Sequence, residues 1–185
     1  MDNTENSAVE YTLSAGRANL IALFLIIPIL ALTLLPFSLI WDFELAKAGY
    51  KILLRYFWVI LLGGVVVHES LHGIGWAIFA KSGFRSIRFG IIWKYITPYC
   101  HCKDPLKVKH YMVGGALPLV AMGIIPSIVA LMVGNGFLIC FGILFIWAAG
   151  GDIIMLHMMN RLPLNTIVAD HPDKLGFYIV NEHNN

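Results

Sequence analysis

The sequence predicts a polytopic, all-α membrane protein with four transmembrane helices and a short β-like cytoplasmic insertion between the second and third helices. Hydrophobic residues make up 58% of the 185 residues and charged residues only 13%, whereas soluble domains carry about 25% charged residues. The mean hydropathy is +0.75. Four apolar segments are each longer than the roughly 20 residues that cross a bilayer core of ~30 Å. They are residues 18–41, 56–80, 111–133 and 137–159.

The first segment is predicted to be a retained helix rather than a signal peptide. Its leader carries Asp2, Glu5 and Glu10 but only one basic residue, Arg17, whereas a signal peptide begins with a basic region and ends at a small-residue cleavage site. We therefore expect an N-terminal tail over 1–17, a single transmembrane domain over 18–159 and a C-terminal tail over 160–185.

The distribution of basic residues predicts the orientation. With four spans, the two tails and the 81–110 loop share one side and carry ten Lys and Arg residues, against three in the 41–55 loop. The positive-inside rule then places both termini and the 81–110 loop in the cytoplasm. The formal net charge of +2 is too small to indicate a nucleic-acid partner. The chain is predicted to be an integral membrane protein of the bacterial inner membrane.

The 81–110 loop is predicted to contain short strands. Residues 84–96 are rich in β-branched and aromatic side chains that partly alternate, and Gly83, Gly90 and Pro98 punctuate them. An interfacial anchor of aromatic and basic residues is an alternative interpretation, and the two are compatible.

The second apolar segment contains His68-Glu69-Ser-Leu-His72. On a helix the two histidines lie one turn apart on one face, where two neutral imidazoles can bind one Zn²⁺. Glu69 lies about 100° away around the helix, so it is placed to take a proton from water rather than to bind the metal. An ionisable side chain in a bilayer costs ~2.5–3.5 kcal/mol on insertion scales, so three of them within five residues indicate a functional site. A buried polar network at a helix interface is the alternative.

A catalytic zinc site needs a third protein ligand and an open position. Asp152 lies deep in the fourth segment after the small residues Ala148-Ala-Gly-Gly151, which permit close helix approach. His68 lies twelve residues past Tyr56 and Asp152 fifteen past Phe137, so their depths agree within about one turn if both segments run in the same direction. The sequence therefore favours Asp152 as the third metal ligand.

Other metal-binding residue types lie outside the apolar segments. His171 follows the fourth segment and could approach the site from the cytoplasmic side. Cys100-His101-Cys102 has suitable donor atoms, but neighbouring residues of an extended segment point in alternate directions. With Cys140, the three cysteines indicate no disulfide framework. We therefore keep Cys100, His101, Cys102 and His171 as secondary candidates.

Together these features resemble the site-2 protease class of intramembrane zinc metalloproteases. The sequence motifs are also similar to those of a smaller bacterial family of zincin peptidases. The shared motifs are the His-Glu-x-x-His helix, Tyr-Cys-His-Cys at 99–102, Gly-Gly-Asp at 150–152 and Asp-His-Pro at 170–172. The resemblance implies that His68, His72 and Asp152 bind zinc and that Glu69 is the general base. Site-2 proteases usually carry an Asn-Pro-x-Pro element before the aspartate, whereas this chain has no proline there.

The predicted function is zinc-dependent hydrolysis of peptide bonds in membrane proteins or peptides by a membrane-embedded endopeptidase. The alternative is a non-catalytic membrane metal-binding protein, such as a carrier, a sensor or a regulatory pseudoenzyme. The expected cofactor is Zn²⁺, and the expected partners are a membrane-protein or peptide substrate and the lipid bilayer.

Overall fold

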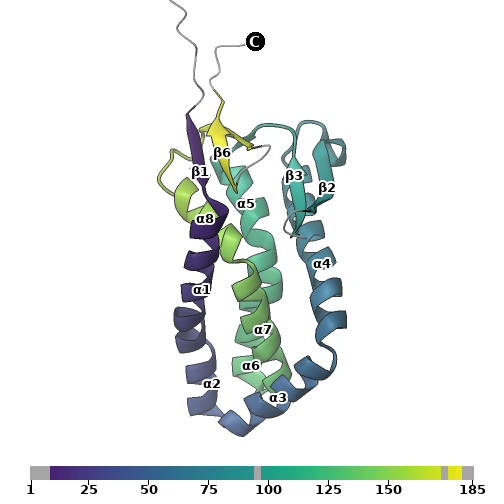
Figure 1. Ribbon diagram of the computed structural model, residues 1–185, viewed down its shortest axis with the longest axis vertical. Coiled ribbons are helices and arrows are strands. Elements are labelled where there is room, and N and C mark those ends of the chain that lie inside the picture. The colour runs from purple at the N-terminus through teal and green to yellow at the C-terminus, as the bar shows by residue number, and fades with distance from the viewer. Residues whose placement is uncertain (1–8, 94–96, 172–174, 181–185) are drawn as a thin grey trace, which may run out of the picture.

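A bundle of long helices carries a small amount of sheet at one end (Figure 1). The computed structural model describes residues 9–93, 97–171 and 175–180. Pro172, Lys94 and Lys174, which entered the motif and charge arguments, lie outside the described residues, as do residues 94–96 of the predicted β-like segment. The helices are α1 (Ala15–Leu32), α2 (Leu34–Ile40), α3 (Phe43–Arg55), α4 (Phe57–Ala77), α5 (Val108–Pro118), α6 (Ile125–Val133), α7 (Gly136–Ala148) and α8 (Gly150–Met159).

Three of the predicted spans are helical over nearly their whole length. α1 and α2 form one apolar stretch over Gly16–Ile40, α4 forms a second, and Val108–Val133 forms a third in which a π-helical segment (Leu119–Ile124) joins α5 to α6. By length and apolar composition each is able to cross a membrane, and the pair α7 and α8 adds a fourth if it counts as one span. The turn between the third and fourth spans uses Gly134, whose φ of 68° is left-handed.

The fourth span is not the continuous helix that we predicted for 137–159. It breaks at Ala149, and α7 and α8 meet at an angle of 54°. The break falls in the Ala-Ala-Gly-Gly sequence before Asp152, where small side chains and two glycines oppose a sharp bend least.

The prediction of a loop over 41–55 is also wrong, because α3 occupies this segment. Asp42 caps this helix through its Oδ1, which accepts a hydrogen bond from the Glu44 N–H at 3.0 Å. Ala46, Gly49 and Leu53 are buried and α3 packs along α7. Its polar face lies at the end of the bundle opposite the sheets (Figure 1). That face carries Glu44, Lys47, Lys51 and Arg55.

The strands form two separate sheets. In the insertion, β2 (Ile87–Ile92) and β3 (Thr97–Cys102) form an antiparallel hairpin, which confirms a strand within 84–96 and places its partner just after it. The second sheet has the order β1-β6-β5-β4, all antiparallel, and was not predicted. Its strands are β1 (Glu10–Leu13), β4 (Leu106–Lys107), β5 (Ile167–Asp170) and β6 (Leu175–Ile179). Both predicted tails therefore contribute strands to one sheet.

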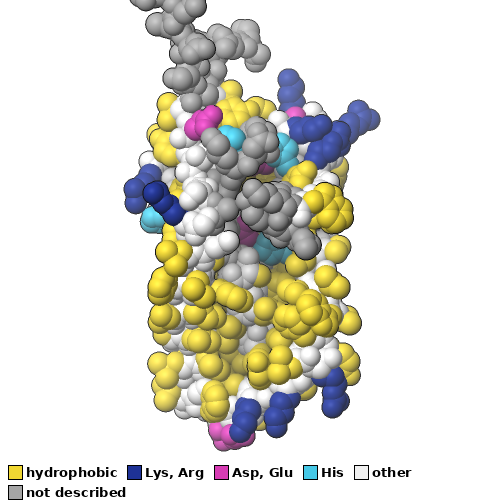
Figure 2. All heavy atoms as spheres, in the orientation of Figure 1, with side chains coloured by type: hydrophobic (Ala, Val, Ile, Leu, Met, Phe, Trp, Pro, Cys, Tyr) yellow, Lys and Arg dark blue, Asp and Glu magenta, His cyan; other side chains and the backbone are white. Residues whose placement is uncertain are grey.

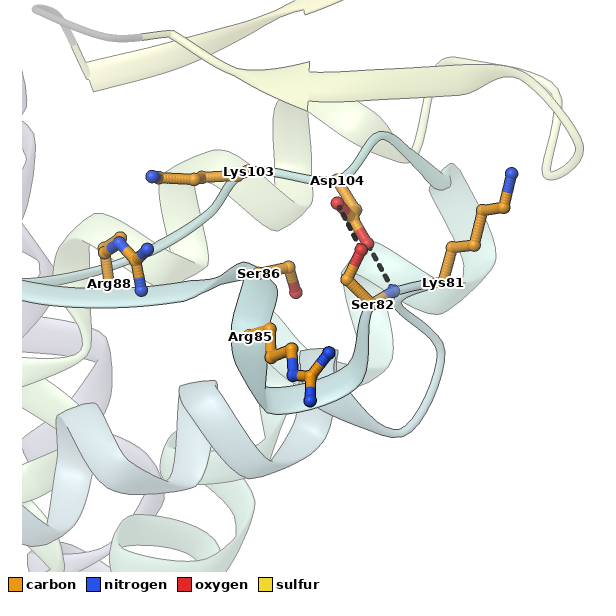
Figure 3. A pocket seen from close by; sticks show the side chains of 7 residues that line it. All are labelled: Lys81, Ser82, Arg85, Ser86, Arg88, Lys103 and Asp104. Atoms are coloured by element: carbon orange, nitrogen blue, oxygen red, sulfur yellow. Dashed lines mark hydrogen bonds between the residues drawn. The ribbon is translucent and has the colours of Figure 1, made fainter.

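Both sheets lie at the same end of the bundle, as the predicted topology requires of the two tails and the 81–110 loop (Figure 1). On the face shown in Figure 2, exposed hydrophobic side chains cover the bundle between two ends that carry Lys and Arg. At the sheet end, the turn after α4 is tied to the turn after β3, because the Ser82 N–H donates to Asp104 Oδ2 at 2.7 Å (Figure 3). The distribution of apolar and basic side chains along the bundle is compatible with a membrane protein.

Candidate metal centre

The histidines of the His-Glu-x-x-His sequence lie on the buried face of α4. His68 is 9% exposed and His72 is 5% exposed, and their ring centroids are 4.9 Å apart. The helix continues for five residues past His72, so regular helical spacing fixes both side chains on one face, as the sequence predicts.

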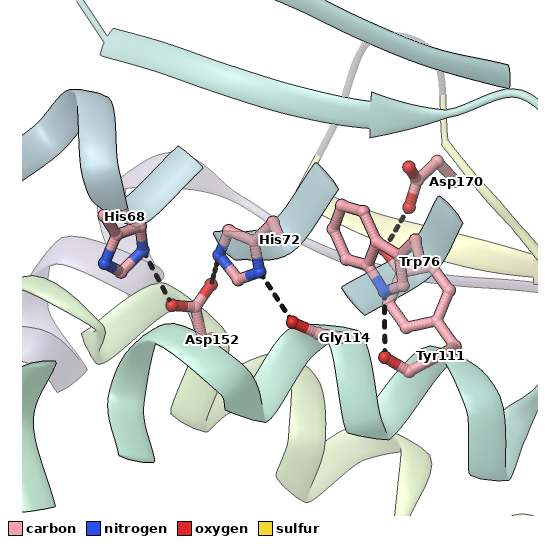
Figure 4. A network of polar contacts seen from close by, with 7 residues as sticks. All are labelled: His68, His72, Trp76, Tyr111, Gly114, Asp152 and Asp170. Carbon is pink, nitrogen blue, oxygen red and sulfur yellow. Dashed lines mark hydrogen bonds and ion pairs between the residues drawn. The ribbon is translucent and has the colours of Figure 1, made fainter. Parts of the chain in front are cut away.

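Asp152 lies opposite this face, in the first turn of α8. The bend at Ala149 redirects the chain so that the carboxylate meets both imidazoles (Figure 4). His68 Nε2 is 3.1 Å from Asp152 Oδ2, and His72 Nε2 is 3.3 Å from Asp152 Oδ1. Asp152 therefore meets two histidines that lie about eighty residues before it in the sequence.

The donor atoms fit a zinc ion. One ligand atom from each residue lies within 4.8 Å of the other two, and ligands of a tetrahedral Zn²⁺ at ~2.0–2.1 Å stand about 3.3 Å apart. Asp152 Oδ2 is buried and has no hydrogen-bond partner among the described residues, although His68 Nε2 is close. A buried carboxylate oxygen left in this way normally demands a counter-charge. Two imidazoles and one carboxylate are a donor set that suits Zn²⁺ and leaves a fourth position open.

A second layer of contacts orients His72. Its Nδ1 lies 3.0 Å from the Gly114 carbonyl oxygen, which accepts the ring N–H and leaves Nε2 free to face Asp152 (Figure 4). One face of the His72 ring stacks on Trp76 at a centroid distance of 5.0 Å. Trp76 Nε1 in turn donates a hydrogen bond to the Tyr111 carbonyl oxygen at 2.9 Å. A Cβ on Gly114 would lie 2.1 Å from the Trp76 ring, so glycine is needed for this close approach of α4 and α5.

Glu69 is half-buried, and its carboxylate lies close to the backbone of Cys100 in β3. Glu69 is not a member of the ligand cluster, which agrees with its position about 100° around the helix from His68. The candidate base therefore lies between the metal-binding face of α4 and the edge of the hairpin.

Two of the secondary candidates, His101 and Cys102, belong to a different cluster, built around Asp170. Tyr111 donates its hydroxyl proton to Asp170 Oδ1, and the Cys102 N–H donates to Oδ2 at 2.9 Å. His101 Nδ1 lies 3.2 Å from the same oxygen. Burial raises the pKa of the Asp170 carboxyl, and the hydrogen bonds from Tyr111 and Cys102 oppose that rise. We call Asp170, Tyr111, His101 and Cys102 the Asp170 latch, because they join β5, α5 and β3.

The cysteines and His171 are not brought to the histidine cluster. Burial raises the pKa of the Cys100 thiol far above its usual value, and the nearby Glu69 and Asp170 charges add to the shift. Burial likewise raises the pKa of Cys102. His171 Nε2 lies 3.6 Å from Glu10 Oε2, which ties the end of β5 to β1.

A family model described as "Putative zincin peptidase" matches residues 61–167, more than half of the chain. The chain belongs to this family. The matched range runs from α4 to the start of β5 and contains His68, Glu69, His72 and Asp152. Searches of curated proteins and of solved structures found no match. The family description indicates, at a coarse level, a zinc metallopeptidase, and the convergence of His68, His72 and Asp152 is compatible with that description.

Several residues that support the site in this zincin peptidase family member are not predicted from the sequence. Asp170 enters the prediction only as part of Asp-His-Pro, where its neighbour His171 is the candidate ligand. Tyr111 and Gly114 enter it only as members of the third apolar segment. Asp170 could have been found as a carboxylate between two short segments rich in β-forming residues. Gly114 could have been found from the Gly-Gly pair at 114–115, which inside an apolar helix indicates a close approach of another helix.

Proposed function

We propose that the protein is a zinc-dependent endopeptidase of the site-2 protease type, embedded in a membrane, that hydrolyses peptide bonds of membrane proteins. The observation that carries the proposal is the convergence of His68, His72 and Asp152 beside Glu69 on a helix apolar enough to cross a bilayer. In the proposed topology both termini and the hairpin face the cytoplasm of a bacterial cell. The site then lies towards the cytoplasmic side, since α4 ends a few residues beyond His72.

Each protein group has a separate task in peptide hydrolysis. Bound Zn²⁺ would supply activation of water and polarisation of the substrate carbonyl. His68, His72 and Asp152 would hold it, and the Gly114 carbonyl fixes the His72 tautomer. Glu69 takes a proton from the attacking water as the new C–O bond forms. It later passes that proton to the amine nitrogen as the C–N bond breaks.

The hairpin lies close to where a substrate would meet Glu69. Gly73 in α4 packs against Ile87 and Phe89 of β2, and the backbone of Cys100 in β3 lies close to the Glu69 carboxylate. A transmembrane helix has its carbonyls engaged in hydrogen bonds, so a substrate must unwind before hydrolysis. We propose that the unwound, extended segment binds alongside this hairpin by strand addition.

The test is Glu69→Gln, measured for zinc content, thermal stability and cleavage of a membrane protein that accumulates in cells lacking this one. Gln is nearly isosteric with Glu but cannot act as a base, so turnover should fall by ~10²–10⁴ while zinc content and stability stay unchanged. Glu44→Gln, an exposed carboxylate on α3, is the matched control and should cleave normally.

Two results would contradict the proposal. If Glu69→Gln fully restores cleavage in cells lacking this protein, Glu69 is not the general base. Loss of zinc in the same variant would make Glu69 a ligand and favour the alternative of a non-catalytic metal carrier or sensor.

A further inference from the structure

A basic hollow lies at the sheet end of α4, outside the metal centre. It has a volume of about 510 Å³ and is formed by the turn after α4, the 3-10 turn Gly83–Ser86, the start of β2 and the turn after β3 (Figure 3). We call it the basic hollow. Its lining residues are Lys81, Ser82, Arg85, Ser86, Arg88, Lys103 and Asp104.

The positive charge of the hollow is not compensated from within. Four basic side chains and one carboxylate give the lining a formal charge of +3. The carboxylate, Asp104, already accepts hydrogen bonds from the N–H and the hydroxyl of Ser82, at 2.7 and 3.4 Å. Over the described parts of the chain, no carboxylate lies within ion-pair distance of Lys81, Arg85 or Lys103. A concave surface with such a charge concentrates anions.

Exposed apolar side chains lie next to the lining residues in sequence. Phe84 belongs to the 3-10 turn that forms part of the hollow and is 68% exposed, and Ile78 precedes Lys81 and is 71% exposed. Aromatic and apolar side chains next to cations are typical of the membrane–water interface, where the ring lies among lipid chains and the cation lies at the phosphates. A site for a soluble phosphate compound gains nothing from exposed Phe and Ile next to its lining residues.

We propose that the basic hollow binds the phosphate of an anionic phospholipid, with Phe84 lying against its acyl chains. The proposal rests on the membrane embedding proposed above but not on peptidase activity. Arg85 and Arg88 supply guanidinium groups, which bind phosphate oxygens in pairs, and Lys81 and Lys103 supply point charges.

Lipid bound in the hollow would anchor the hairpin over the catalytic helix. The lining joins the end of α4 to both strands of the hairpin, because Arg88 belongs to β2 and Lys103 follows β3. The same hairpin packs on Gly73, next to His72, and contacts Glu69. An anionic headgroup would therefore draw together the segments that enclose the candidate base.

The experiment measures lipid binding by the full-length protein with Glu69→Gln as background, so that proteolysis plays no part. The protein is placed in nanodiscs of phosphatidylcholine, and phosphatidylglycerol is titrated in. Retention of phosphatidylglycerol is read by native mass spectrometry and by the shift in thermal unfolding. The triple variant Lys81→Gln, Arg85→Gln, Lys103→Gln should weaken phosphatidylglycerol binding at least tenfold.

The matched control removes the same charge from the same end of the bundle. Lys107→Gln, Lys109→Gln, Arg161→Gln changes three exposed cations outside the hollow, and its affinity for phosphatidylglycerol should stay within twofold of the parent. All six positions are exposed, so both variants should unfold at the parent temperature in pure phosphatidylcholine. The single variants Arg85→Gln and Lys103→Gln provide the same test if the triple variant unfolds early.

Two outcomes would overturn the proposal. Equal losses in the two triple variants would mean that only the general charge of this end attracts lipid. Displacement of phosphatidylglycerol by an equimolar amount of inorganic phosphate or glycerol phosphate would mean that the hollow is a site for a soluble phosphate. Loss of peptidase activity in Glu69→Gln has no bearing on either reading, so the two proposals fail independently.

Discussion

Two clusters in this protein pair an aspartate with histidine, and they are built in opposite ways. At the metal centre Asp152 faces two imidazole nitrogens, and its Oδ2 has no hydrogen-bond partner among the described residues. In the latch, Asp170 receives a tyrosine hydroxyl and a backbone N–H, and one histidine lies beside it. Among the described residues Asp152 therefore has only imidazole nitrogens as polar neighbours, whereas Asp170 is satisfied by a hydroxyl and a backbone N–H. We propose that this difference in hydrogen-bond donors separates a metal ligand from a structural residue of the same type.

Removing the latch carboxylate should produce the largest loss of stability. Asp170→Ala leaves the Tyr111 hydroxyl and the Cys102 N–H without their acceptor, which should cost about 2–4 kcal/mol of unfolding free energy. Thermal and denaturant unfolding of the purified protein measure it. In a double-mutant cycle with Tyr111→Phe the two losses should be strongly non-additive. Additive losses would mean that the hydroxyl does not bond to Asp170.

Changing the second layer of the metal centre should weaken zinc binding by a smaller amount. Gly114→Ala places a Cβ 2.1 Å from the Trp76 ring, so α5 must move and the Gly114 carbonyl leaves His72 Nδ1. Loss of such a second-layer contact typically costs about 10–100-fold in metal affinity. Zinc competition with a chelator measures the change. Gly63→Ala in the same bundle meets open space and should leave zinc affinity unaltered.

The thiols near the latch should show the smallest effect, in reactivity. Burial raises the pKa of Cys100 and of Cys102, so the thiolate fraction at pH 8 is lower than in an exposed cysteine. Alkylation by iodoacetamide should be at least about tenfold slower than for a free thiol, and its rate should still be rising with pH above 9. A rate plateau near pH 8 would contradict the burial of these thiols.

The sequence predicted the convergence of His68, His72 and Asp152 better than the surrounding fold. Helical periodicity is local, so the spacing of His68 and His72 determines that they share a face, and counting residues from Tyr56 and Phe137 placed Asp152 at a matching depth. The sheet was missed because β1 pairs with β6, whose residues lie more than 160 positions away. Nothing local in either tail specifies such a partner.

Two further elements were missed for local reasons. The 41–55 segment is predicted to be a loop because its Lys47, Lys51 and Arg55 are used only to predict the orientation of the chain in the membrane. The buried positions Ala46, Gly49 and Leu53 follow a helical period that would have indicated an amphipathic helix. The bend at Ala149 was missed because an apolar run gives no sign of a change in direction. Yet that bend is what turns Asp152 towards α4.

The central claim is tested most directly by comparing the two aspartates. Asp152→Ala and Asp170→Ala remove the same atoms from the two clusters, and zinc per protein chain can be measured by elemental analysis of each purified variant. We predict that Asp152→Ala loses its zinc, as His68→Ala and His72→Ala do. Asp170→Ala, assayed at a temperature where it remains folded, should retain the stoichiometry of the parent. Full zinc retention by Asp152→Ala, or loss of zinc from folded Asp170→Ala, would contradict the assignment of the metal centre.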